Sequence, residues 1–288
     1  MVREIQKRAG WMLRFLDHPS AIIGTILVSV LVLVALLAPL MAPHDPYEAE
    51  SLRDAYQSPS QLFPFGTDGL GRCVLSRVIF GTRISLTVGL VVQGISLFLG
   101  ITLGLLAGYW EGWVDDIISN ATNVMFGFPN LLFALAIVSV LGPGLYNVFV
   151  ALGLVGWPII VRLVRGQTLS IKHKGYVEAA RASGCSHTFI LLRHILPQCL
   201  PPVLVMATMG IAGAILAEAG LSFLGLGAQP PHPSWGSMIA RGREYIWQAP
   251  WITAFPGAAI FITVLGFNLL GDGLRDLLDP RIQSERIR

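Results

Sequence analysis

The chain has 288 residues, of which 53% are hydrophobic and 13% are charged, and its net charge is +3. Soluble domains contain about 25% charged residues, and the apolar residues here form long uninterrupted runs, which excludes a soluble domain with a large core and indicates an integral membrane protein. The small net charge and the lack of a basic and aromatic stripe exclude a nucleic-acid partner. Cys73, Cys185 and Cys199 show no C-x-x-C spacing, so we predict neither a disulfide framework nor a metal site.

The N-terminal region predicts a first membrane span that is retained in the mature protein. Residues 1–20 are polar and basic, and residues 21–41 form an apolar run long enough to cross a bilayer. A cleavable signal peptide has a shorter apolar region of about 7–15 residues, followed by small residues at the cleavage site. We therefore expect a cytoplasmic segment over residues 1–20 and a transmembrane helix over residues 21–41.

Residues 42–84 predict an extracytoplasmic loop that ends in an amphipathic helix. The first part of this region is polar and rich in proline. From Val74 onward, a helix would place Val74, Leu75, Val78 and Ile79 on one face and polar side chains elsewhere, a pattern typical of a helix that lies in the membrane interface. The same pattern fits a plain amphipathic lead-in to the next span, and both interpretations stay open.

Residues 85–270 predict a core of five further transmembrane helices. The apolar runs that indicate them cover residues 85–107, 117–141, 147–164, 203–221 and 252–270. We expect a bend at Pro129, which neighbouring helices can accommodate. Gly100, Gly104 and Gly108 share one face of the second span, and small residues at this spacing let two helix backbones approach closely.

The distribution of lysine and arginine predicts the orientation of the six spans. With six spans both termini lie on one side, and this side would hold fourteen basic residues against six on the other. Because loops rich in lysine and arginine stay in the cytoplasm, we expect a cytoplasmic location for both termini. The polar hairpin over residues 165–199 and the tail over residues 271–288 would share that side.

The hairpin within residues 165–199 predicts two short helices joined by a hinge. Residues 176–183 are mostly good helix formers, and Gly184 suits the left-handed conformation that closes a helix. Ser186 can cap a second helix, which we expect to end at Pro197.

The first of these helices is lined by alanines. Ala179, Ala180 and Ala182 leave a surface with little side chain, over which the groove of another protein could close tightly. The alternative is a plain surface hairpin, in which Glu178 pairs with Arg181 at a spacing of three residues.

Polar side chains inside the predicted spans are candidates for the translocation pathway or for helix packing, because their burial in a bilayer is costly. These residues are Gln93, Asn120, Asn123, Glu218 and Asn268. For the three asparagines we favour hydrogen bonds between helices over contacts with a substrate. Glu218 lies near the outer end of its span, and an interfacial carboxylate, a packing hydrogen bond and a pathway role stay open for it.

The chain lacks the sequence needed to hydrolyse ATP. It has no Gly-Lys pair and therefore no G-x-x-x-x-G-K-[ST] phosphate-binding loop. The spans also contain no row of carboxylates, which disfavours a proton-coupled carrier.

The hairpin resembles the EAA loop in the membrane subunits of ABC importers. Glu178-Ala179-Ala180, Gly184 and Leu196-Pro197 match that loop, whereas His194 stands where the general pattern has isoleucine. The resemblance implies a coupling helix that docks into a cleft on a separate ATPase subunit. The residues to which it assigns this coupling are Glu178, Ala179, Ala180, Arg181, Gly184, Leu196 and Pro197.

Three further segments resemble the second permease subunit of the dipeptide and oligopeptide importers, a branch that also serves nickel chelates and glutathione. They are FGTDGLGRCVLSRVIFGTRISL over residues 65–86, LSFLGLGAQPPHPSWGSMI over residues 221–239 and GFNLLGDGLRDLLDP over residues 266–280. Cys73 departs from the pattern, since the family has aspartate there.

This resemblance implies an all-α polytopic protein with six transmembrane helices and the type I ABC importer permease fold. It implies a location in the bacterial inner membrane and a heterodimer with a homologous permease. It also implies two ATPase subunits that hold ATP and Mg, and an extracytoplasmic substrate-binding protein. The chain itself would bind no cofactor, would contact membrane lipid, and would form part of the path for dipeptides or oligopeptides. The alternatives are nickel chelates or glutathione as cargo or, in a different class, an ion-coupled carrier or channel.

Overall fold

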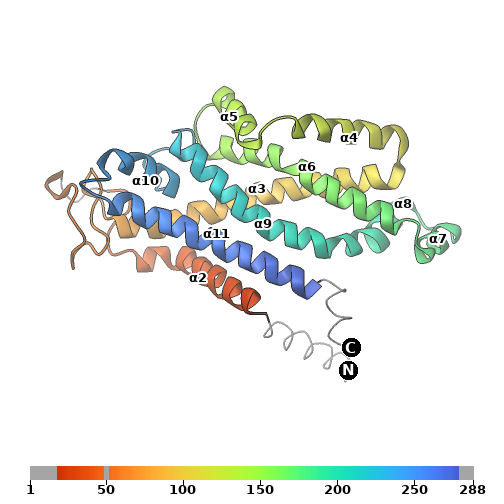
Figure 1. Ribbon diagram of the computed structural model, residues 1–288, viewed down its shortest axis with the longest axis horizontal. Coiled ribbons are helices and arrows are strands. Elements are labelled where there is room, and N and C mark those ends of the chain that lie inside the picture. The colour runs from red at the N-terminus through yellow and green to blue at the C-terminus, as the bar shows by residue number, and fades with distance from the viewer. Residues whose placement is uncertain (1–17, 49–51, 279–288) are drawn as a thin grey trace, which may run out of the picture.

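The computed structural model describes residues 18–48 and 52–278, and these form a helical bundle (Figure 1). Five of their helices are long and apolar enough to cross a membrane: α2 (Pro19–Met41), α3 (Val74–Trp110), α6 (Leu145–Ile171), the continuous helix His187–Phe223, and α11 (Trp251–Leu278). The pair α4 (Gly112–Phe126) and α5 (Asn130–Leu141) passes the same test together, although the two helices are bent by 91°. The predicted all-α membrane fold is therefore confirmed, with a sixth span if the bent pair counts as one.

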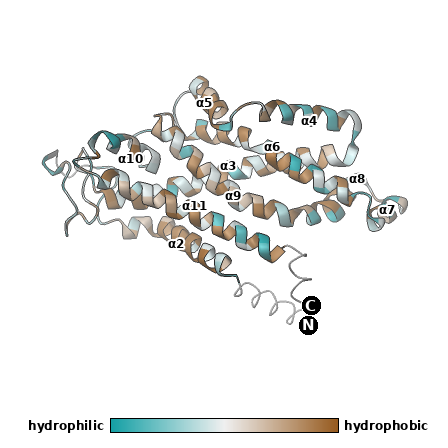
Figure 2. Cartoon of the chain, viewed as in Figure 1, coloured by the Kyte–Doolittle hydropathy of each residue, from teal (hydrophilic) through white to brown (hydrophobic). Residues whose placement is uncertain are grey.

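The long helices lie side by side, with short polar elements at both ends of the bundle (Figure 1). Figure 2 shows hydrophobic residues along the long helices and hydrophilic residues gathered at their ends. Helix α7 (Gly175–Ala182) lies at one end and α10 (Trp235–Gly242) at the opposite end. The remaining elements are the 3-10 turn η1 (Leu52–Asp54), α8 (His187–Ile190), the π-helical turn η2 (Leu191–Ile195), α9 (Leu196–Phe223) and the 3-10 turn η3 (Arg243–Tyr245).

Helices α3 and α6 pack together along a stripe of glycines. A Cβ atom on Gly100 would lie 2.3 Å from the Cβ of Ile160, and one on Gly104 would lie 2.7 Å from the Cβ of Val164. At Gly108 the corresponding distance to the Cβ of Thr168 is 2.6 Å. Real Cβ atoms do not approach this closely, so the helix pair requires glycine at these positions.

Helices α2 and α11 are held together in the same way. A Cβ atom on Gly24 would lie 2.3 Å from the Leu270 nitrogen. A few residues further, where α2 begins and α11 ends, the His18 ring lies 3.9 Å from the Asp276 carboxylate. The start of α2 and the end of α11 therefore lie at the same end of the bundle.

The expected interfacial helix after residue 74 is instead the first part of α3. Val74 is 0% exposed and Arg77 is 3% exposed, so this segment does not lie on a surface. Helix α10 covers it, and the Trp235 indole Nε1 donates a hydrogen bond to the Val78 carbonyl at 3.0 Å. The local pattern suggested an interfacial helix, but long-range packing buries both its apolar and its polar residues.

The predicted span over residues 117–141 consists of two helices. Helix α4 ends at Phe126 and α5 begins at Asn130, with Gly127 and Pro129 in the break. Proline has no N–H with which to continue the preceding helix, and the Pro129 carbonyl instead accepts the first bond of α5 from Phe133 at 3.0 Å. The bend at Pro129 is confirmed, and it is a complete break.

Two other helices extend beyond the predicted spans. Helix α6 continues to Ile171, whereas the apolar run ends at residue 164, and α11 continues to Leu278 rather than residue 270. Polar residues such as arginine and glutamine are good helix formers. The end of an apolar run therefore marks the edge of the hydrocarbon and not the end of the helix.

Replacing Gly104 by leucine should destabilise the protein by about 1–3 kcal/mol, because the side chain would force α3 away from α6. Gly94→Leu is the matched control, because nothing lies within 4 Å of a Cβ on this glycine of the same helix. Thermal unfolding of the purified protein in detergent measures both. Equal melting temperatures for the two variants would contradict the packing described here.

Candidate functional site

The exposed hairpin begins with α7, which ends in a Schellman motif. The Cys185 N–H donates to the Ala180 carbonyl at 3.1 Å, and the Gly184 N–H donates to the Arg181 carbonyl at 3.0 Å. Gly184 has φ of +78°, the left-handed conformation predicted for it. These bonds satisfy the last carbonyls of α7 and fix the direction in which the chain leaves it.

The second helix of the hairpin begins as predicted but does not end at Pro197. The Ser186 hydroxyl caps it by accepting a hydrogen bond from the Phe189 N–H at 3.3 Å. After α8, the chain passes through η2, where the Leu196 N–H donates to the Leu191 carbonyl five residues back, and enters α9. A proline ring clashes with the carbonyl four residues before it, and the wider π turn gives Pro197 room.

The π turn contains His194, the residue that stands where the EAA loop has isoleucine, and Ile195 directly after it. Ile195 is 0% exposed and occupies the core position next to it. The His194 ring is half-buried between the rings of Tyr176 at 6.2 Å and Phe189 at 5.6 Å. The second helix therefore keeps an aliphatic contact with the core although the isoleucine is shifted by one residue.

The hairpin is fixed to the bundle by a buried apolar cluster. Val177 of α7 is 0% exposed and packs in one cluster with Tyr109 at the end of α3 and Ile171 at the end of α6. Ile190 and Ile195 join this cluster from the second helix. The hairpin is therefore packed on the ends of α3 and α6 and not held by its connections alone.

The face of α7 opposite Val177 is small and open. Glu178, Ala179 and Ala182 are exposed, and Ala180 is half-buried. The Arg181 guanidinium lies over the Tyr109 ring, 5.6 Å from its centre, and no ion pair joins it to Glu178 in the part of the chain that the structure describes. The alternative was a plain surface hairpin in which Glu178 pairs with Arg181. This pair is not formed among the described residues, so it does not hold α7 in place.

Charged pairs join the turn between α3 and α4 to α6 beside the hairpin. Lys172 is 4% exposed, and its ammonium donates to the Gly108 carbonyl at 2.9 Å and to the Glu111 carboxylate. This donation lowers the pKa of Glu111 below its ordinary value. Asp115 receives two bonds from Arg165, at 2.5 and 2.6 Å. Arg165 of α6 and Lys172 directly after this helix thus neutralise Asp115 and Glu111, whose own segment contains no basic residue.

Gln93 lines a cavity in the middle of the bundle, between α3, α5, α6 and α9. The cavity has a volume of about 410 Å³, and its walls include Ser96, Asn130 and Gly210. Gln93 is 6% exposed, and its amide Nε2 has no hydrogen-bond partner. The Nε2 of Gln93 therefore does not make the helix-packing hydrogen bond that was one of the two roles considered for this residue.

The other polar residues predicted within spans lie away from this cavity. Asn123 accepts a hydrogen bond from Arg162 at 3.0 Å, so the expected bond between helices is formed there. Asn120 and Asn268 are exposed and make no hydrogen bond within the described residues. Glu218 is 0% exposed, and its Oε1 accepts a hydrogen bond from Ser222 of the same helix at 2.5 Å, whereas its Oε2 has no hydrogen-bond partner within the described residues.

Sequence reasoning missed two groups of residues at these sites. Ser96 and Asn130 line the cavity, and an asparagine directly after the predicted bend at Pro129 was the available signal. Asp115 and Arg165 form an ion pair across fifty residues, and no local pattern announces such a pair.

The membrane-spanning bundle and the docked, open hairpin define the membrane component of a transporter. Residues 100–284 match the model of the inner membrane component of binding-protein-dependent transport systems, and the chain belongs to this family. Residues 9–59 match the N-terminal transmembrane domain of oligopeptide transport permease C. The protein is thus a multi-pass inner membrane permease subunit of an ABC importer and not an enzyme, and the ion-coupled carrier or channel is excluded.

The comparisons with individual proteins agree with this family. The chain is 43% identical over 287 residues to the glutathione transport system permease protein GsiD of Pectobacterium atrosepticum, covering 99% of this chain and 95% of the relative. It is 44% identical over 264 residues to the dipeptide transport system permease protein DppC of Alkalihalophilus pseudofirmus, covering 92% and 86%. An inward-facing structure of the MetNI methionine ABC transporter matches the fold with a TM-score of 0.57 and 20% identity, covering 70% of this chain and 96% of that one.

Replacing Val177 by alanine should loosen the hairpin by about 2 kcal/mol, because it removes two buried methyl groups from the cluster that holds α7. The rate of tryptic cleavage at Arg181 in the purified protein measures this loosening. Ala182→Ser, at an exposed position of the same helix, should leave the rate unchanged. Equal cleavage of the Val177→Ala variant and the parent would contradict the role given to Val177.

Proposed function

We propose that α7 is the coupling helix through which partner ATPase subunits drive this permease. The observation that carries the proposal is the two-sided construction of α7. Val177 fixes one face to the ends of α3 and α6, and the opposite face presents Ala179 and Ala182 to the outside. A groove on a partner can approach the backbone closely there, and displacement of the groove would move the bundle with it.

Helix α9 connects this hairpin to the other end of the molecule. The run His187–Phe223 is continuous through the π turn. At its far end, the N-terminus of α10 sits directly on α9, where a Cβ on Gly236 would lie 2.3 Å from the Ala219 carbonyl oxygen. The Ser222 hydroxyl bonds Glu218 and accepts from the Ala228 N–H at 3.2 Å, which ties α9 to the loop before α10. Movement of the hairpin would therefore be transmitted to the opposite end of the bundle.

Such a mechanism requires the hairpin to stay docked throughout the cycle. ATP binding can shift the permease between inward-facing and outward-facing states only by its differential affinity for those states. In our proposal ATP and Mg bind the two ATPases, their closure moves both coupling helices, and this chain binds no nucleotide. A homologous permease supplies the second coupling helix and the other half of the pathway.

The cavity beside Gln93 supports a solute with amide groups as cargo. Its lining includes the polar side chains of Gln93, Ser96 and Asn130, glycines and alanines, and no charged residue. The Ser96 hydroxyl donates to the Gly153 carbonyl at 3.1 Å, whereas the Gln93 Nε2 has no partner among the described residues and suits a carbonyl group of a peptide. Together with the glutathione and dipeptide systems of the relatives, this supports dipeptides, oligopeptides or glutathione, delivered by an extracytoplasmic binding protein.

The orientation we propose places α7, the start of α2 and the end of α11 on the cytoplasmic side. His18 and Asp276 lie together, which suits an even number of spans. The basic residues Arg165 and Lys172 lie at the same end as α7, as expected for the cytoplasmic face.

Replacing Ala179 by glutamate, or Gly184 by proline, should lower uptake and abolish stimulation of the ATPases, while the subunit still inserts and assembles. We expect a loss of about tenfold or more, within the usual range of coupling free energies. The glutamate would hold a docking groove away from the backbone, and proline cannot adopt the positive φ of Gly184. Uptake and ATPase activity of the reconstituted importer measure both effects.

Ala179→Ser is the matched control for this test, because it keeps the side chain small at the same position. It should preserve uptake. Parental transport by the Ala179→Glu variant, with normal stimulation of ATP hydrolysis, would contradict coupling through α7.

Replacing Gln93 by methionine should lower uptake without lowering the melting temperature, because the side-chain Nε2 makes no hydrogen bond with the residues that the structure describes. A residue that serves only packing would show the opposite result, a lower melting temperature with uptake in proportion to the folded protein. Asn268→Leu, on an exposed face of α11 outside the cavity, serves as the comparison.

A further inference from the structure

A second cavity, of about 300 Å³, lies at the end of the bundle opposite α7. It is enclosed by the loop before α3, the first turn of α3, α10 and the start of α11. Its lining combines charged, hydroxyl and apolar side chains from these four elements and from the turn that follows α10. None of these residues belongs to the coupling hairpin or to the cavity beside Gln93.

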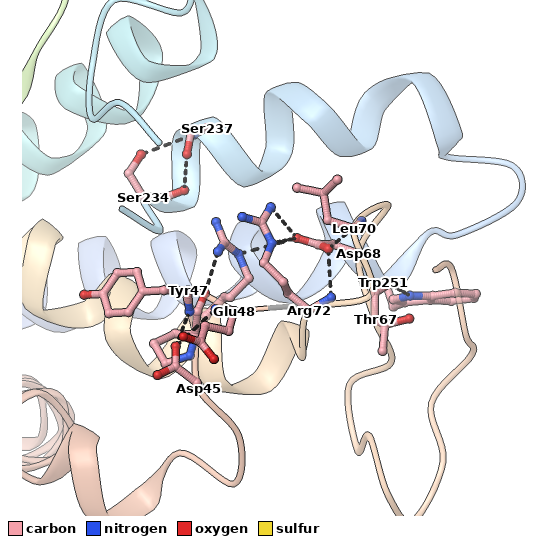
Figure 3. A network of polar contacts seen from close by, with 12 residues as sticks. Asp45, Tyr47, Glu48, Thr67, Asp68, Leu70, Arg72, Ser234, Ser237 and Trp251 are labelled. Carbon is pink, nitrogen blue, oxygen red and sulfur yellow. Dashed lines mark hydrogen bonds and ion pairs between the residues drawn. The ribbon is translucent and has the colours of Figure 1, made fainter. Parts of the chain in front are cut away.

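The only carboxylate in this lining, Asp68, already has its partners. Its Oδ1 accepts from the N–H groups of Leu70 at 2.9 Å and Arg72 at 3.0 Å. Its Oδ2 accepts from the Arg72 guanidinium, from Nε at 2.8 Å and from Nη2 at 2.7 Å. Figure 3 shows Leu70 and Arg72 gathered around Asp68. Asp68 therefore neutralises Arg72 and has little capacity left for a second cation.

Arg77 is the cation that this arrangement leaves without full compensation. It is 3% exposed, and its Nη1 donates to the Pro46 carbonyl at 2.6 Å. Its Nε lies 3.6 Å from the Asp68 Oδ2, which is an ion-pair distance but too long for a hydrogen bond, and it has no hydrogen-bond partner in the part of the chain that the structure describes. A guanidinium carries five N–H donors, and a buried donor left without an acceptor costs about 1–3 kcal/mol.

The rest of the lining adds positive charge and neutral donors. Arg241 of α10 also lines the cavity and is exposed, so the lining holds three guanidinium groups and one carboxylate. The Tyr56 hydroxyl faces Tyr245, and burial raises the pKa of Tyr56 to about 12. Tyr56 is therefore neutral at physiological pH, and its hydroxyl is hydrogen-bonded to Tyr245.

We propose that this cavity binds the carboxylate of a small organic acid. Arg77, with Arg241 at the rim, would receive the carboxylate, since a planar guanidinium can bind its two oxygens together. Leu70, Met238 and Ile252 form an apolar wall that suits an aliphatic group next to the acid. The carboxyl end of a peptide carries both features, a free α-carboxylate and a small side chain next to it.

The location gives the site a role at the entrance of the transporter. This step rests on the proposed orientation, in which the end with α10 faces outward. A solute released there would meet a positive cavity formed between α3, which lines the central cavity, and α10, which sits on α9. The site would hold the carboxyl end of the solute before the amide groups enter the pathway.

The test uses the whole importer, with its ATPases and without the binding protein, in lipid nanodiscs. The probes are N-acetyl-L-alanine, which carries a carboxylate, and N-acetyl-L-alaninamide, its neutral counterpart. Saturation-transfer NMR of their methyl groups reports weak binding. We expect binding of the acid, with much weaker binding of the amide.

Variants assign the binding to this cavity. Arg77→Met should weaken binding of the acid by about tenfold or more, because it removes the buried guanidinium. Arg241→Gln should weaken it by about two- to fivefold, because its charge is exposed and screened, and it leaves the buried network intact. Arg243→Gln is the matched control, since Arg243 lies over the Phe223 ring, 5.3 Å from its centre, and does not line the cavity.

Equal binding of the two probes would overturn the proposal, as would parental affinity for the acid in both Arg77→Met and Arg241→Gln. A separate assay adds the binding protein and measures its docking to the same nanodiscs. Weaker docking to Arg241→Gln, with unchanged binding of the acid, would also overturn the proposal, because the cavity would then serve a protein contact. The measurement needs no transport. A failure of the coupling test at α7 would therefore leave this result standing, and a failure here would leave the coupling test unaffected.

Discussion

The close approach of α3 and α6 is the constraint on which the rest of the structure depends. Glycines at residues 100, 104 and 108 let the two backbones approach closely over about two helical turns. In a bilayer, helix association relies on such packing, because lipid is as apolar as the helices themselves. The ends of this pair supply Tyr109 and Ile171, on which the hairpin is docked, and its middle supplies one wall of the central cavity.

Helix α9 gives the molecule its connection from end to end. It starts at the hairpin, passes the central cavity at Gly210 and ends beneath α10. Three prolines lie in its first two turns, and the π turn before them gives the first, Pro197, room. The helix thus stays continuous where the sequence suggests a stop, and this continuity allows events at α7 to affect the opposite end.

Charge is arranged differently at the two ends of the bundle. Beside α7, the acids Glu111 and Asp115 each have a basic partner on α6, and these pairs consolidate the end that is proposed to meet the ATPases. At the opposite end, one carboxylate faces three guanidinium groups around a cavity. The first arrangement is complete within the chain, whereas the second leaves a hydrogen-bond donor of Arg77 without an acceptor.

Local chemistry was enough to determine the membrane class, the break at Pro129, the Ser186 cap and the left-handed Gly184, because each depends on hydrophobic length or on backbone preferences within a few residues. The packing of helices distant in sequence decided the rest. Burial of Val74 to Ile79 under α10, passage of the second hairpin helix through Pro197, the Asp115–Arg165 pair and the free amide of Gln93 all depend on such neighbours. A side chain's partner across fifty or more residues follows from how the helices pack, and no local pattern contains that information.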